Sequence, residues 1–235
     1  LSFFSGTSSS GTTGSFTVYT GHATGGKGGD IMLSVGPGDT GNGGDINIIS
    51  GETTASSKRG GGVTVTAGLG SSSTNGQGGS FVASGGSSTG GTGGAVSISS
   101  GRGTSTTSGA LVLRSVNAGT TGVSGILSFY TGTSSSGSSG AIVIGTGAAT
   151  NGKSGDVVLS VGTGDVAVGG DIRMDSGGAS SSTGGAMSFA SGVSTHTTSG
   201  SITLSSANAG TLGVSGLIKF RTGTTSDGSS GAMLF

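Results

Sequence analysis

The chain contains no cysteine and no tryptophan, a single proline, and few charges: nine lysines and arginines against nine aspartates and glutamates in 235 residues. Without cysteine no disulfide can form, and the redox compartment stays open, because secreted and cytosolic proteins can both lack cysteine. The neutral net charge provides no electrostatic footprint for nucleic acid or for an acidic membrane surface. No apolar run is long enough to span a membrane, and no charged leader precedes a cleavable apolar segment.

What the chain has instead is glycine, at 57 positions, arranged with a period of fifteen residues. The stretch from Asp30 to Gly44 illustrates the unit: a short alternating segment, Asp30 to Val35, followed by a glycine-rich return. Low charge with much Gly, Ser and Thr suggests disorder. A strict period argues against disorder, so the repeats take priority.

Positions two and four of each repeat carry an apolar residue. Position two is occupied by Leu1, Phe16, Ile31, Ile46, Val63, Phe81, Val96, Leu111, Leu127, Ile142, Val157, Ile172, Met187, Ile202, Ile218 and Met233. Position four is occupied by Phe3, Val18, Leu33, Ile48, Val65, Ala83, Ile98, Leu113, Phe129, Ile144, Leu159, Met174, Phe189, Leu204, Phe220 and Phe235. Alternation with period two predicts strands, and no segment has the 3.6-residue spacing of a helix. One apolar pair cannot be buried by its own repeat, so we predict an all-β fold: a parallel β-solenoid of about sixteen stacked coils, without helices.

Glycine dominates positions seven and fifteen, which we interpret as structural corners. A corner needs either a positive φ or a close approach of two backbones, and glycine permits both. The corner glycines singled out are Gly21, Gly29, Gly36, Gly44, Gly132, Gly140, Gly147, Gly155, Gly162 and Gly170.

A longer repeat overlies the short one. The sequence at 1–14 returns in nearly the same form at 127–140. We therefore predict a single array over 1–235, with an eight-coil super-repeat at 1–126 and a shorter second copy at 127–235. Neither end carries a polar cap of the kind that solenoids need. This predicts an excerpt of a longer array or a filament protomer that associates end to end. The aromatic residues at position five, Phe4, Tyr19 and Tyr130, are either lateral contacts between rods or ordinary exposed residues.

Reactive groups are scattered rather than clustered. Gly36, Gly38 and Gly41 match a dinucleotide-binding pattern, but no helix follows to face a pyrophosphate. His22 and His196 lie eleven repeats apart and cannot share a catalytic or metal site. A nucleophile needs an adjacent base and an orienting group, and no such set is present. We predict no enzyme activity and no cofactor.

Aspartate is the one candidate metal ligand. Asp30 and Asp45 occupy position one of successive repeats, as do Asp156 and Asp171. Stacking would place each pair about 5 Å apart, which either recruits a cation such as calcium or leaves solvated carboxylates. We favour solvated carboxylates, because neither pair has an obvious third ligand.

The segment from Gly28 to Gly36 has the form GGD-Φ-x-Φ-S-x-G, where Φ is a large apolar residue. Repeats of this form resemble the long Gly/Ser/Thr-rich β-solenoid proteins of microalgal and bacterial cell surfaces. The resemblance implies a structural role in an extracellular fibre, surface appendage or adhesive filament. The alternatives are an ice-binding protein, for which Thr64 and Thr66 supply one Thr-x-Thr rung, and a surface adhesin whose loops bind glycans. Sugars O-linked to the serine- and threonine-rich loops are a further possibility.

Overall fold

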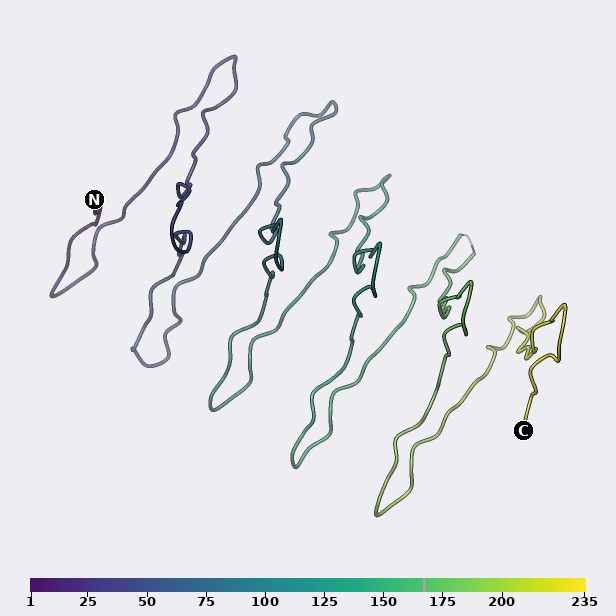
Figure 1. Cartoon of the computed structure of the whole chain (residues 1–235). Helices are drawn as coiled ribbons and strands as arrows, with labels where there is room; N and C mark the ends of the chain where they lie inside the picture. Colours follow the sequence, from purple (N-terminus) through teal and green to yellow (C-terminus); the bar gives the residue numbers. More distant parts are fainter. Residues whose placement is uncertain (167) are drawn as a thin grey trace. The chain divides into compact units, whose positions relative to one another are not determined.

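The structure is a computed structural model that describes residues 1–166 and 168–235. Over these residues the backbone forms no helix and no β-strand. It consists of irregular segments interrupted by bends and turns. Figure 1 accordingly draws a plain tube that repeatedly doubles back in narrow loops. The prediction of an all-β parallel β-solenoid of stacked coils is therefore wrong.

The backbone hydrogen bonds explain why the stack does not form. In six repeats of the described chain, the N–H of the glycine that ends the repeat donates to the carbonyl of the glycine at position seven of the same repeat. The six bonds are Gly61 to Gly51, Gly79 to Gly68, Gly94 to Gly86, Gly109 to Gly101, Gly185 to Gly177 and Gly200 to Gly192, with N–O distances of 2.8 to 2.9 Å. We call this pairing the neck. A parallel stack would need bonds between neighbouring repeats, whereas the neck bond lies within one repeat in all six cases.

The side chain at position six contacts the glycine that ends the repeat in two cases. The hydroxyl of Thr20 donates to the carbonyl oxygen of Gly29 at 3.2 Å, and the hydroxyl of Ser50 donates to the carbonyl oxygen of Gly61 at 3.0 Å. Both acceptors are the glycines that end their repeats. The neck thus uses the small polar residues of positions six and seven on one limb and the last glycine on the other.

One contact joins the apolar residues of two neighbouring repeats. The rings of Phe3 and Phe16 stack with their centroids 6.1 Å apart and an interplanar angle of 28°. Phe3 occupies position four of its repeat, and Phe16 occupies position two of the next. Position four of one repeat therefore contacts position two of the next.

No residue of the described chain is buried, so there is no hydrophobic core. Apart from the terminal Leu1, apolar residues at position two are between 43% exposed (Ile218 and Met233) and 67% exposed (Phe81). Large apolar residues at positions three and five are more exposed: Met32 is 85%, Val143 is 89% and Ile49 is 89% exposed. The period-two alternation therefore survives as a difference in exposure, although it does not produce a sheet.

The chain divides into two units, Leu1–Gly125 and Ile126–Phe235. The first unit contains the necks closed by Gly61, Gly79, Gly94 and Gly109, and the second contains those closed by Gly185 and Gly200. The same glycine-to-glycine hydrogen bond therefore occurs in both units.

Candidate functional site

The glycines that end each repeat lie against position six of the same repeat. A Cβ added to Gly44 would lie 2.9 Å from Cγ1 of Val35, and a Cβ on Gly170 would lie 2.9 Å from Cγ1 of Val161. The corresponding distances to the threonine Cγ2 atom are 3.4 Å at Gly29, 3.7 Å at Gly140 and 3.5 Å at Gly155. The close approach of position six is thus a physical reason for glycine at Gly44 and Gly170, whereas a Cβ at Gly231 would meet no heavy atom within 4 Å.

The glycines at position seven are less crowded. A Cβ at Gly21, Gly36, Gly132, Gly147 or Gly162 would meet no heavy atom within 4 Å. None of the ten glycines singled out at the corners has a positive φ. Their backbone is therefore open to other residues, and among the position-seven glycines of the described chain the left-handed conformation occurs at Gly6, with φ of 86°.

Left-handed residues occur in the returns between the necks. Gly25 and Gly41 have φ of 79° and 85°, and Ser57, Asn75 and Asn151 have φ of 59°, 56° and 60°. Glycine and asparagine visit this region at low cost, whereas serine does so rarely. The asparagines were a readable signal in the sequence, but the serine was not.

Gly85 is a structurally demanding residue that the repeat pattern hides. It occupies position six, where other repeats carry serine, threonine, valine or alanine. A Cβ at Gly85 would lie only 2.1 Å from the carbonyl oxygen of Gly94. The glycine at a position where the other repeats carry a side chain is the feature of the sequence that could have identified Gly85.

Two of the candidate cation ligands form ion pairs with a nearby lysine. Asp30 accepts from Nζ of Lys27 at 3.0 Å, and Asp156 accepts from Nζ of Lys153 at 2.8 Å. Both pairs are well exposed, so each contributes at most about 1 kcal/mol to stability. For Asp45 and Asp171, the described residues provide no ion pair. Within residues 1–166 and 168–235, no three His, Asp or Glu side chains gather in a way that could hold a metal ion.

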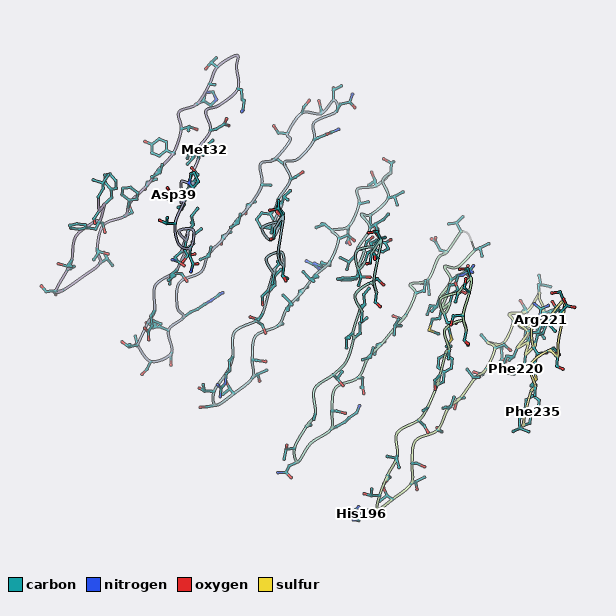
Figure 2. The ribbon with its side chains drawn as sticks, in the orientation of Figure 1. Met32, Asp39, His196, Phe220, Arg221 and Phe235 are labelled. Atoms are coloured by element: carbon teal, nitrogen blue, oxygen red, sulfur yellow. The ribbon has the colours of Figure 1, made fainter. Side chains whose placement is uncertain are left out.

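His196 lies at the tip of a narrow loop (Figure 2). Its Nδ1 is 2.8 Å from the hydroxyl of Thr195, while the hydroxyl of Ser194 accepts from the backbone N–H of Thr197 at 2.9 Å. A hydroxyl beside an imidazole is the beginning of a nucleophile and base pair. The described part of the chain forms no pocket in which a substrate would be held against it. These bonds therefore belong to the turn itself.

The side chains that recur most regularly along the chain are apolar. We call the residues at positions two and four of each repeat the apolar pairs. They recur along the whole sequence, and those within the described chain are all exposed where the residue is large. No helix among the described residues has the length and apolar character needed to cross a membrane. No protein family, no curated protein and no solved structure matches this chain.

Proposed function

We propose that this chain is a structural component of an extracellular or cell-surface fibre, that it self-associates, and that it is not an enzyme. The observation that carries the proposal is the exposure of every apolar pair in a chain whose described residues form no core and no pocket. Large exposed apolar surface marks an interaction site when its residues lie together. Repetition of the same pair from one repeat to the next favours a partner that is itself repetitive.

The proposed fibre differs from the layered rod that the sequence pattern alone predicts. Six of its repeats are loops closed at a neck, and the apolar pairs meet partners outside the chain. The extracellular or surface location is what the resemblance to Gly/Ser/Thr-rich repeat proteins of cell surfaces implies, and the hydroxyl-rich loops remain available for O-linked glycans. Immunogold labelling of intact source cells would test the location.

Sedimentation velocity and negative-stain electron microscopy of the purified chain, over a range of concentrations, test self-association. We expect the mean sedimentation coefficient to rise with concentration and elongated assemblies to appear on the grid. A chain that remains monomeric at every soluble concentration would overturn the proposal. If that monomer shaped ice crystals or bound immobilised glycans, the ice-binding or adhesin alternatives would replace it.

A further inference from the structure

Position two differs in environment from position three of the same repeat. Ile142 and Val157, at position two, are 54% and 53% exposed, whereas Val143 and Val158, the next residues along the chain, are 89% and 80% exposed. Neighbouring residues of similar size thus lie in different surroundings. Position two faces partly towards the rest of the chain, and position three faces away from it.

The apolar pairs of two neighbouring repeats also touch, at Phe3 and Phe16. Phe3 and Phe16 belong to different repeats and stack ring on ring, yet both remain more than half exposed. This contact therefore joins the apolar pair of one repeat to the apolar pair of the next. The contact leaves apolar area on both rings for a further partner.

The amount of apolar area is sufficient for a specific interface. An aliphatic side chain that is about half exposed offers on the order of 50–100 Å² for burial. Eight to sixteen such side chains, the content of four to eight repeats, reach the roughly 800 Å² per partner that stable protein interfaces bury. Each of the two units contains enough repeats to supply this area by itself.

The chemistry of the remaining surface favours a second copy of this chain over a lipid surface. The net charge is zero, with nine positive and nine negative side chains. The described ion pairs Lys27–Asp30, Lys153–Asp156 and Arg173–Asp175 neutralise some of these charges locally. A surface that attracts anionic lipid needs an excess of basic residues. A second copy, in contrast, presents apolar pairs at the same fifteen-residue interval.

We propose that the apolar pairs form the self-association surface and that the occupant of this surface is a second copy of the same chain. The inference rests on the proposed function and specifies which face of the repeat makes the contact. Positions three and five face away from the interface. Their charged and polar members, such as Arg173 and Lys219, keep the opposite side of each segment hydrated.

Two double variants of the full chain test this surface. Ile142→Asp with Val157→Asp changes position two in successive repeats, and Val143→Asp with Val158→Asp changes position three in the same repeats. Both variants add two negative charges at adjacent positions, so their electrostatic effects on association are matched. Because neither position belongs to a buried core, neither variant is expected to unfold the loops. Equal amide exchange of Gly185 in both variants would confirm that the neck of the following repeat is intact.

Sedimentation velocity should show that the position-two variant needs about tenfold more protein, or more, to reach the same degree of association as the unsubstituted chain. The position-three variant should need less than about threefold more. If the unsubstituted chain associates and both variants lose association equally, the proposed surface is wrong although the fibre function stands. If the unsubstituted chain does not associate at all, the fibre function itself fails.

Co-sedimentation of the same three proteins with phosphatidylcholine vesicles tests the alternative occupant, a lipid surface. We expect no vesicle binding by any of them. Binding that is lost only in the position-two variant, by a chain that does not self-associate, would assign the apolar pairs to a lipid surface and overturn the proposal.

Discussion

Glycine serves two separate purposes in this chain, and they fall on different positions. At the end of a repeat, glycine permits the close approach of two backbone segments, as at Gly94, whose missing Cβ would lie 3.1 Å from the backbone nitrogen of Gly86. Within the return, glycine supplies left-handed backbone, as at Gly41. Substitution should therefore have different consequences at residues that look alike in the sequence.

Gly85 and Gly86 provide the sharpest comparison. Gly85→Ala places a Cβ 2.1 Å from the carbonyl oxygen of Gly94, whereas Gly86→Ala places one in open space. Gly85→Ala should separate the limbs and break the bond from the Gly94 N–H to the Gly86 carbonyl. A net loss of about 0.5–1.5 kcal/mol corresponds to a two- to tenfold faster exchange of the Gly94 amide.

Hydrogen exchange followed by nuclear magnetic resonance measures this effect. Gly86→Ala serves as the control, because it removes the same glycine flexibility from the chain without the steric clash. Equal exchange of the Gly94 amide in both variants would show that the neck does not depend on close approach at Gly85.

The closed loop is the structural element of this molecule, and its conformation depends on the residues that reverse the chain. Ser57 adopts a φ of 59° in the loop between Gly51 and Gly61, and the N–H of Lys58 donates to the carbonyl of Ala55 in the same turn. An L-residue in this conformation costs about 1–2 kcal/mol. The loop tolerates this cost because its neck bond and the Ser50 hydroxyl bond hold the two limbs together.

Replacing Ser57 with valine should loosen this loop. A β-branched side chain is poorly tolerated at positive φ, so Ser57→Val should raise the exchange rate of the Gly61 amide. The matched control is Ser56→Val, one residue earlier, where φ is not positive. The expected difference is on the order of tenfold, corresponding to about 1–2 kcal/mol. Similar rates in the two variants would contradict a role for left-handed backbone at Ser57.

The sequence predicts parts of this element well and its assembly poorly. The fifteen-residue period, the alternation at Ile142 and Val143 and the placement of glycine at Gly44 can all be read directly, since each reflects local stereochemistry. The partner of each segment cannot be read in this way. A strand-like stretch such as Ile31 to Val35 is compatible with a neighbour in parallel or antiparallel orientation, or with none. The neck bonds decide the question, and glycine-to-glycine hydrogen bonds leave no side-chain signature.

The candidate aspartates illustrate the same limit. Their equivalent positions in successive repeats predict mutual contact only if the repeats stack in parallel. In the described chain, Asp30 and Asp156 instead pair with a lysine three residues earlier. That contact depends on local spacing and could be recognised from Lys27 and Lys153 in the sequence.

For the molecule as a whole, the absence of a core in the described residues makes apolar surface the dominant property. Few proteins of 235 residues leave their regularly spaced Ile, Leu, Val and Phe residues exposed, because the hydrophobic effect favours burial. The proposed association would bury them between chains. Its temperature dependence should then be that of apolar burial.

Association should weaken on cooling and strengthen in sulfate. Apolar burial loses driving force at low temperature, and sulfate strengthens it because the ion is excluded from protein surface. Moderate sodium chloride should have little effect, since the net charge is zero. Sedimentation velocity at two temperatures, with and without sulfate, measures these changes. Association that strengthens on cooling and dissolves in sodium chloride would point to ion pairs instead of apolar contacts.

The neck also has a consequence for the gene that encodes this chain. Because the bond between Gly185 and Gly177 closes within one repeat, unequal crossing-over that removed or duplicated fifteen codons would leave the remaining loops closed. Copy number can then drift between alleles while each surviving loop keeps its shape. Length polymorphism in whole multiples of the repeat, rather than scattered point changes at the terminal glycines, is the population-genetic pattern that such a molecule should leave.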